Sequence, residues 1–342
     1  MKPLERVITS IQFKEPDKVP LFHFLTTHGA KILEMSLEKY YTSNPAENIA
    51  KAQIELQKRF NHDCLYPFFY AGIEHQAFGG KVIFNKNGPP QSGNPIFNDI
   101  DDLLSTELPT PQDEIFQPIV KAQKILFDQL GDKLPIINSI IAPLSLPIML
   151  FGFEKWLDLI LTKPEDVKEA LNYLNSYSIS LANYLFENHA TAIAYFNPLA
   201  SPSMLKLEEY LFLSLDVCKK FFQASKGFSV FALAGGISEP LIPHLIDMNV
   251  PAVVISSDDN LKRIKHDFGE KIVLLGNLNN IEMANWEKKT AEKQVKQCIA
   301  DAAAGGGYIL TDQHGDLPIS VSDEILTEIS RTRDTNGKYH DK

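Results

Sequence analysis

The chain alternates short, nearly continuous apolar runs with longer stretches in which the apolar residues keep to one side of a helix. The short runs are rich in β-branched and aromatic residues, which is typical of strands covered on both faces. Eight of them can be counted: Val19–Leu25, Cys64–Phe69, Leu134–Ile140, Thr191–Phe196, Phe228–Leu233, Ala252–Ser256, Ile272–Leu278 and Tyr308–Asp312. Such strands, each separated from the next by a helix, predict parallel βαβ units.

Three of the intervening stretches carry clear helix signals. Asn44–Phe60 opens with Asn-Pro, and Lys163–Asn188 begins with a proline and acidic residues, which favour a helix N-terminus. Trp286–Ala304 is followed by three glycines, Gly305–Gly307, which end a helix. Eight strands alternating with helices predict an α/β protein, a closed (β/α)8 TIM barrel that occupies residues 1–330 as a single domain.

Two segments depart from this alternation. Gly80–Asn98 contains a short apolar run and then Gly88-Pro89-Pro90, which predicts a hairpin excursion at about residues 80–98, after the second strand. Residues 331–342 are polar and predict a C-terminal tail. We find no internal repeat with a period of about 20 to 50 residues and no linker that would split the chain.

The composition excludes several classes of function. With 43 acidic and 33 basic residues among 342, the net charge is −10, which disfavours a surface that follows nucleic-acid phosphates. The scattered cysteines, Cys64, Cys218 and Cys298, favour buried thiols in a reducing compartment. The N-terminal segment lacks a signal-peptide pattern, and no apolar run reaches the roughly 18 residues of a membrane span. We therefore expect a cytoplasmic protein that binds neither nucleic acid nor membrane.

In a barrel of this kind the active site lies at the carboxyl ends of the strands. His314 and Asp312, at the end of the last strand, are predicted to be catalytic. The histidine is a general acid or hydrogen-bond donor, and the aspartate orients it or binds substrate. The alternative is that His314 caps a helix or anchors its loop. Six further side chains near strand ends are predicted to bind substrate: His23, Tyr70, Asn138, Asn197, Asp258 and Asn277.

Several polar residues also have a structural interpretation. His23 lies in the pocket only if its side chain points inward, whereas His28 fits a solvent-exposed loop. Asp258 and Asn277 stand in segments that favour helix N-caps. Asp63 precedes its strand, and we expect it to support the fold through a hydrogen bond to loop backbone.

Six segments, each at an expected strand, carry the motifs on which a family resemblance rests: ERVITSIQFKEPDKVPLF, RFNHDCLYPFFYAGIEHQAFGGKV, LPIINSIIAPLSLPIMLFG, YFNPLASPSML, LLGNLNN and YILTDQHGDLPISVS. In this order they resemble the uroporphyrinogen decarboxylase superfamily. YFNPLASPSML resembles the branch that holds the methylcobalamin:coenzyme M methyltransferases. The resemblance runs from about Glu5 to Ile329 and implies a TIM barrel with its site at the strand ends.

The resemblance also implies functional residues that this chain mostly lacks. The zinc ligands of the methyltransferase branch fall on Ala232, Ala234 and Gly315, which cannot bind metal, so we predict no zinc and no other cofactor. The arginine pair of the decarboxylases falls in His23–Lys31, which has no arginine, and their pyrrole-binding aspartate falls on Tyr70. Uroporphyrinogen carries many carboxylates that need cationic partners, so we expect no turnover of it.

These observations leave three functions open. The leading hypothesis is a diverged, zinc-independent enzyme that acts on a small molecule or tetrapyrrole-like ligand through decarboxylase-like acid–base chemistry at His314. The alternatives are a non-catalytic protein that binds a tetrapyrrole or corrinoid, and a corrinoid-linked methyltransferase component. The expected partner is a small-molecule, tetrapyrrole or corrinoid ligand, and a homodimer stays open.

Overall fold

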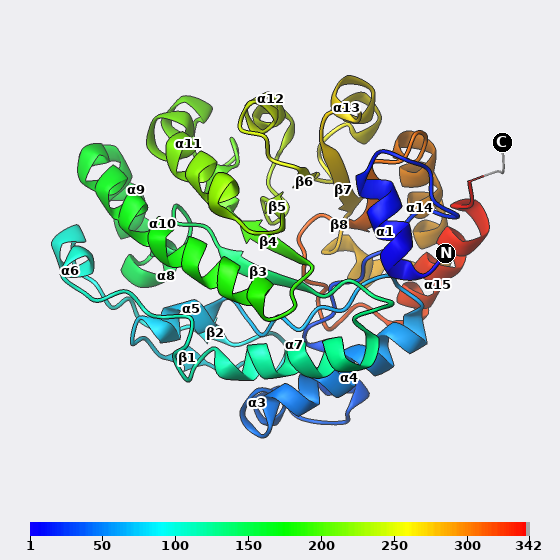
Figure 1. The fold of residues 1–342 in the computed structure, drawn as a ribbon, viewed down its shortest axis with the longest axis horizontal. Helices are drawn as coiled ribbons and strands as arrows, with labels where there is room; N and C mark the ends of the chain where they lie inside the picture. The colour runs from blue at the N-terminus through cyan, green and yellow to red at the C-terminus, as the bar shows by residue number, and fades with distance from the viewer. Residues whose placement is uncertain (340–342) are drawn as a thin grey trace.

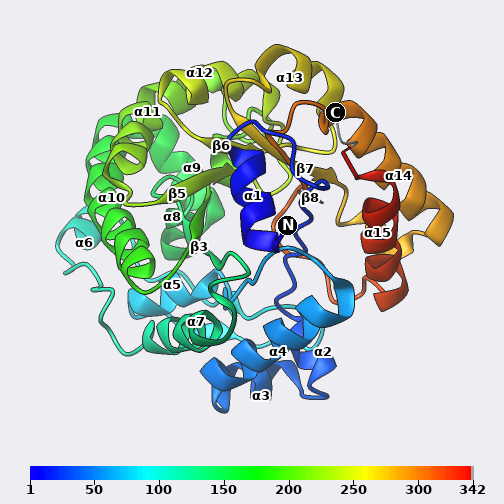
Figure 2. The same cartoon turned by 45° about the vertical axis from the view of Figure 1, so that its right-hand side comes forward.

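The computed structural model describes residues 1–339, in which a ring of strands is surrounded by helices (Figures 1 and 2). Within these residues six parallel strands form one sheet, and each strand pairs with the next one along the chain. They are β3 Ile137–Ile141, β4 Ala192–Phe196, β5 Phe228–Ala232, β6 Ala252–Val254, β7 Val273–Leu278 and β8 Tyr308–Asp312. The predicted α/β class is confirmed, and each of the six coincides with a predicted strand.

The first two predicted strands close the ring without becoming regular strands. Each makes one isolated parallel bridge, Leu21 with Leu310 of β8 and Leu65 with Ile136 beside β3. The two segments join each other where the N–H of Asp63 donates to the carbonyl oxygen of Leu21 at 2.7 Å. Each segment contains a proline, which has no N–H to extend a ladder. The ring is closed as expected, but the prediction of eight regular strands is wrong for these two.

The helices pack around the outside of the ring, in the order of the chain (Figure 2). They are α1 Pro3–Ile11, α2 His28–Ile32, α3 Leu37–Thr42, α4 Pro45–Phe60, α5 Gly72–Ala77, α6 Ile100–Leu104, α7 Gln117–Leu130, α8 Pro147–Phe151, α9 Phe153–Thr162, α10 Pro164–Glu187, α11 Leu207–Ala224, α12 Ile242–Asp247, α13 Leu261–Phe268, α14 Lys288–Ala302 and α15 Asp323–Asn336. The three helices predicted from start and stop signals are confirmed as α4, α10 and α14. Helix α1 is the exception to the outer layer, because it lies across the N-terminal end of the barrel (Figure 2).

A small hairpin follows α5 in the predicted excursion. Strands β1, Val82–Ile83, and β2, Gln91–Ser92, pair antiparallel outside the barrel sheet. Because α5 is in contact with both strands, the hairpin is held beside the carboxyl end of the barrel, where Pro89 at its tip reaches the pocket described below.

The predicted C-terminal tail, residues 331–342, is wrong for its first part. Helix α15 continues to Asn336, and the side chain of Arg333 is fully buried. Its guanidinium forms an ion pair with the carboxylate of Asp63, whose other oxygen lies 2.7 Å from Nη1 of Arg6. Asp63 also accepts the N–H of Leu21 at 2.9 Å, which confirms its expected structural role. This network ties both ends of the chain to the barrel; residues 340–342 of the predicted tail lie outside the described part.

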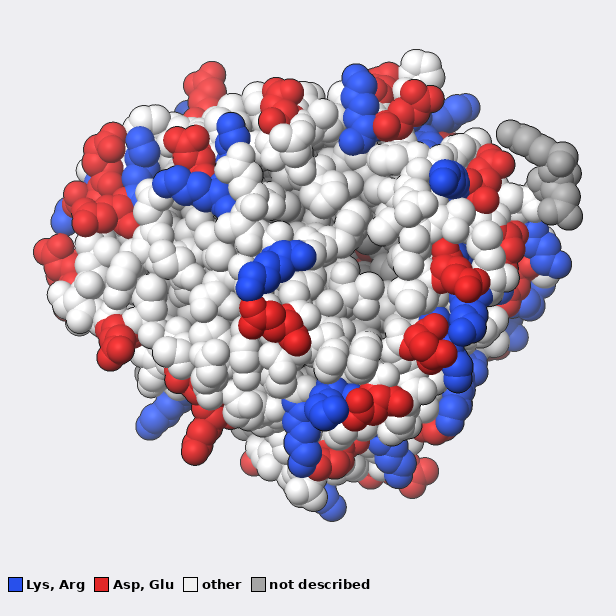
Figure 3. Space-filling model, in the orientation of Figure 1, with Lys and Arg blue, Asp and Glu red and all other residues white. Residues whose placement is uncertain are grey.

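Charged side chains of both signs are mixed on one face of the molecule. On the face in Figure 3, lysine and arginine side chains alternate with aspartate and glutamate and form no large basic patch. Among residues 1–339, none of the helices combines the length and the apolar character that a membrane crossing requires.

Candidate active site at the barrel mouth

A pocket of about 240 Å³ opens at the carboxyl ends of the strands. Its wall is built from the loop after the second barrel segment, the hairpin tip, the ends of β3, β4 and β5, and the turn after β8. The lining residues are Tyr66, Phe68, Phe69, Tyr70, Ala71, Pro89, Ile141, Phe196, Pro198, Ala234, His314, Gly315 and Asp316. We call it the mouth pocket. It occupies the place where barrels of this type carry out their chemistry.

His314 lines the mouth pocket, as predicted from its place after the last strand. Its Nδ1 is buried and has no hydrogen-bond partner within the described residues. Burial lowers the pKa of the imidazole, against the opposing charge of Asp312, which favours the neutral ring. A neutral histidine with a free ring nitrogen can donate or accept a hydrogen bond from a bound molecule.

The sequence interpretation proposed that Asp312 orients the imidazole of His314, but the Asp312 side chain bonds the backbone instead. Its Oδ1 accepts the backbone N–H of His314 at 2.8 Å and that of Gly315 at 2.6 Å. Its Oδ2 is buried and lacks a partner in the described part of the chain, and burial raises the pKa of this carboxyl. Asp312 therefore shapes the turn that presents His314, and its role is to position that turn.

Asp316 is the ionisable residue of the mouth pocket that our sequence interpretation missed. Its Oδ1 accepts a hydrogen bond from the hydroxyl of Thr26 at 2.6 Å. Desolvation by the surrounding protein raises the pKa of the Asp316 carboxyl to about 7, although the Thr26 hydroxyl lowers it. A carboxyl with this pKa exchanges its proton near neutral pH and can act as a general base or acid. The available signal was its position two residues after His314, in the same turn.

One wall of the mouth pocket is aromatic. Tyr70 lies in it, and its hydroxyl donates to Oε1 of Gln76 at 2.8 Å. The rings of Tyr66 and Phe68 lie 5.6 Å apart and are tilted by 30°. The hydroxyl of Tyr66 is bonded to that of Ser139 at 2.7 Å, so its polar atom is already satisfied. This wall offers contact area to a flat or apolar ligand, and binding by Tyr70 stays a prediction.

His23 does not reach the mouth pocket, so the prediction that it binds substrate is wrong. Its neighbours Phe22 and Phe24 line the barrel interior, and alternation along an extended segment turns His23 outward. There Nε2 lies 3.3 Å from the hydroxyl of Ser330 on α15. His28 is likewise buried, with Nε2 3.2 Å from a backbone carbonyl oxygen, which corrects its interpretation as an exposed loop residue.

The predicted asparagines of the third and fourth strands also point away from the pocket. Asn138 faces α7, where its Nδ2 donates to Oε1 of Gln123 at 3.0 Å. Asn197 accepts a hydrogen bond from the hydroxyl of Ser145 at 2.9 Å and is fully buried beside the pocket wall. Asn138 therefore connects β3 to helix α7, Asn197 bonds the loop after β3, and neither lines the mouth pocket.

Asp258 and Asn277 lie together in a different cleft, of about 350 Å³, between the loops after β6 and β7 and helix α14. The amide of Asn277 donates to the carbonyl oxygen of Ser256 at 2.8 Å, and its Oδ1 accepts from the thiol of Cys298 at 3.5 Å. His314 is not part of this cleft. The structure thus separates these two predicted residues from the predicted catalytic residue.

The three positions at which the sequence resemblance implied zinc ligands converge in space. Ala234 and Gly315 line the mouth pocket, and Ala232 lies directly below with Gly315. Gly315 has φ +89°, and a Cβ there would lie 2.6 Å from Cζ of Phe196, so the ring occupies the space of a larger residue. In residues 1–339 no group of three His, Cys, Asp or Glu side chains could hold a metal ion. These residues do not fit a zinc site.

Comparison of the sequence with known proteins identifies a family and several relatives. Residues 2–330 match the family described as uroporphyrinogen decarboxylase (URO-D). The methylcobamide:CoM methyltransferase MtbA of Methanosarcina mazei is 26% identical over 311 residues, which cover 89% of this chain and 90% of that protein. The methylcobamide:CoM methyltransferase MtaA of Methanosarcina barkeri is 21% identical over 80% of this chain and 82% of its own.

Solved structures support the same fold. A methyltransferase from Methanosarcina mazei superposes with a TM-score of 0.85 at 18% identity, over 98% of this chain and 99% of that one. A B12-independent methionine synthase from Shewanella sp. W3-18-1 gives a TM-score of 0.52 at 10% identity, over 94% of each chain. At these identities the likeness concerns the fold.

Proposed function

The chain belongs to the uroporphyrinogen decarboxylase family, and from this premise we propose that it transfers a methyl group between a corrinoid and a small acceptor bound in the mouth pocket. One observation carries the proposal. The curated relatives that align with 80% and 89% of the chain are methyltransferases, and the aligned barrel has an ionisable carboxyl, Asp316, at its mouth. The proposal replaces decarboxylase-like chemistry at His314 as our leading hypothesis.

Asp316 supplies the acid–base chemistry in this proposal. An acceptor X–H gives its proton to a carboxylate oxygen of Asp316, and the lone pair on X attacks the methyl carbon of the methylated corrinoid. The carbon–cobalt bond breaks, and its electron pair stays with cobalt. With the pKa of Asp316 raised to about 7 by burial, a large share of the carboxyl is ionised and ready to take the proton near neutral pH.

His314 has a supporting role. Its neutral ring faces the same pocket and offers a hydrogen bond that orients the acceptor. The side chains at the zinc-ligand positions, Ala232, Ala234 and Gly315, cannot hold a Lewis acid, so the proposal assigns deprotonation of the acceptor to Asp316.

A lyase that acts on a polycarboxylate has less support. In the described part of the chain, the mouth pocket is lined by neither lysine nor arginine, and its ionisable side chains are His314, Asp316 and tyrosines. Several carboxylates would enter a site with an aspartate and without cationic partners.

The test is loss of the methyl group from methylcobalamin when the purified chain is mixed with a panel of small amines, thiols and alcohols. Absorbance follows the corrinoid, and mass spectrometry identifies the methylated acceptor. Asp316→Asn should slow the transfer roughly 100-fold, whereas Asp258→Asn, a matched change in the separate cleft, should not. Corrinoid binding without methyl transfer to any acceptor would contradict the proposal and favour a binding protein, and release of CO2 from a carboxylate ligand would favour a lyase.

A further inference from the structure

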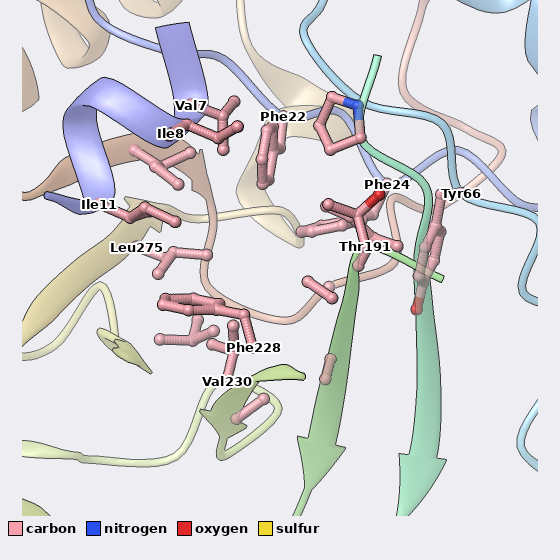
Figure 4. A pocket seen from close by; sticks show the side chains of 18 of the residues that line it. Val7, Ile8, Ile11, Phe22, Phe24, Tyr66, Thr191, Phe228, Val230 and Leu275 are labelled. Carbon is pink, nitrogen blue, oxygen red and sulfur yellow. The ribbon is translucent and has the colours of Figure 1, made fainter. Parts of the chain in front are cut away.

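A second cavity, of about 60 Å³, lies inside the barrel below the mouth pocket and is enclosed almost entirely by apolar side chains (Figure 4). Ile8 and Ile11 of α1 border it at the N-terminal end, together with Phe22 and Phe228 (Figure 4). We call it the interior cavity. Barrels of this type normally fill this space with layers of bulky branched side chains.

The interior cavity exists because several inward positions carry very small residues. Ala192 and Ala194 alternate along β4, and Ala232 ends β5, so all three present a methyl group to the barrel axis. Gly315, at the top, has no side chain. A larger residue at any of these positions would fill part of the space.

The interior cavity and the mouth pocket share part of their walls. Tyr66, Phe196 and Gly315 line both of them. A Cβ on Gly315 would lie 2.6 Å from Cζ of Phe196, so the phenyl ring packs directly on this glycine. The boundary between the two spaces is thus formed by two aromatic rings beside a residue that has no side chain.

We propose that the interior cavity receives the apolar chain of an amphipathic ligand whose polar head stays in the mouth pocket beside His314 and Asp316. This inference rests on the proposed function, since the ligand is the methyl acceptor. A cavity of about 60 Å³ exceeds the roughly 10–15 Å³ that one water needs, yet its apolar wall gives water few partners. A short unbranched alkyl chain is large enough to fill this volume and needs no hydrogen-bond partner in the wall.

The head group follows from the charge of the mouth pocket. As far as the structure describes the chain, an acidic side chain, Asp316, lines this pocket, and lysine and arginine do not. A neutral or cationic head is therefore favoured over a carboxylate or sulfonate. The ligand class is an alkylamine or alkyl alcohol with a chain of a few carbons.

The experiment measures binding of the n-alkylamines from ethylamine to octylamine to the purified chain by calorimetry, without corrinoid. We expect the affinity to rise roughly fourfold per added methylene, equivalent to about 0.8 kcal/mol, until the cavity is full. Ala194→Leu should remove this dependence on chain length, whereas Ala284→Leu, on the exposed η3 turn Glu282–Asn285, should preserve it.

Two results would overturn the inference. One is an affinity that does not change with chain length in the unaltered protein. The other is a chain-length dependence that persists in Ala194→Leu with an unchanged melting temperature, since the chain would then lie in the mouth pocket. If Ala194→Leu does not fold, Ala232→Val makes the same test with a smaller addition. Methyl transfer to ethylamine, which does not need the interior cavity, tests the proposed function independently.

Discussion

Buried ionisable groups are treated in opposite ways at the two ends of this barrel. Near the N-terminal end, the carboxylate of Asp63 is bonded to Arg6, to Arg333 and to a backbone N–H. At the mouth, Oδ2 of Asp312 and Nδ1 of His314 are buried without partners in residues 1–339, and burial raises the pKa of Asp316 to about 7. Satisfied charges stabilise a fold, whereas unsatisfied ones keep bonding capacity for a ligand.

The largest effect that would sharpen this comparison is on stability. Arg333→Met leaves the carboxylate of Asp63 buried with one cation fewer, so the free energy of unfolding should fall by about 3–5 kcal/mol. Urea denaturation measures it. Lys124→Met, which breaks an exposed pair with Asp128, is the control and should change little. A similar small loss in both variants would mean that the buried network contributes no more than a surface pair.

A substitution at the barrel mouth should change the rate of methyl transfer and leave the stability of the fold largely unchanged. Asp316→Asn keeps the size of the side chain and removes the base, so methyl transfer should slow roughly 100-fold. The melting temperature should stay the same or rise. Burial raises the pKa of Asp316 because it disfavours the charged carboxylate, and the neutral amide of asparagine avoids that desolvation cost. Parallel measurements of rate and melting temperature decide it. Normal activity in a folded Asp316→Asn variant would remove Asp316 from the mechanism.

A third prediction concerns how stability depends on pH through two buried histidines, His23 and His62, near the first two barrel segments. Burial, with the charge of Arg333, lowers the pKa of His62 from 6.5 to about 3, so the unfolded chain binds the proton more readily than the folded one. Stability is then complete above pH 6.5 and should fall by up to about 1.4 kcal/mol per pH unit as the pH drops from 6.5 toward 3.

Denaturation curves collected across this range measure the slope, and His62→Gln should make it shallower. The pKa of His23 is also lowered by burial and by the charge of His62, so part of the slope should remain in that variant. An unchanged slope in His62→Gln would show that His62 does not carry the effect.

The smallest expected effect is that of the second ionisable group at the mouth. His314→Gln keeps a hydrogen-bonding side chain but not the ring, and the rate should fall about tenfold, the equivalent of one hydrogen bond. Because Asp312 holds the backbone of this turn and not the imidazole, the fold should be unaffected. A loss as large as that of Asp316→Asn would mean that His314 does more than orient the acceptor and takes part in the proton transfer.

Much of the architecture could be predicted from the sequence because it depends on local patterns. Continuous apolar runs identified the six strands, and helix start and stop signals identified α4, α10 and α14. The chemical identity of a residue is also independent of the fold. Ala232, Ala234 and Gly315 cannot bind zinc in any arrangement, so the departure from the zinc-ligand pattern that the resemblance implies was visible in the sequence.

The directions of side chains were decided by the tertiary structure. A shift of one residue along a strand exchanges its two faces, and a sequence without a register does not show which face is inward. His23 and Asn138 therefore seemed to be pocket residues but face the outer helices. The raised pKa of Asp316 depends on its desolvation by the surrounding folded protein, which the sequence does not show. The interior cavity likewise arises only where alanines of β4 and β5 meet Gly315 across the ring.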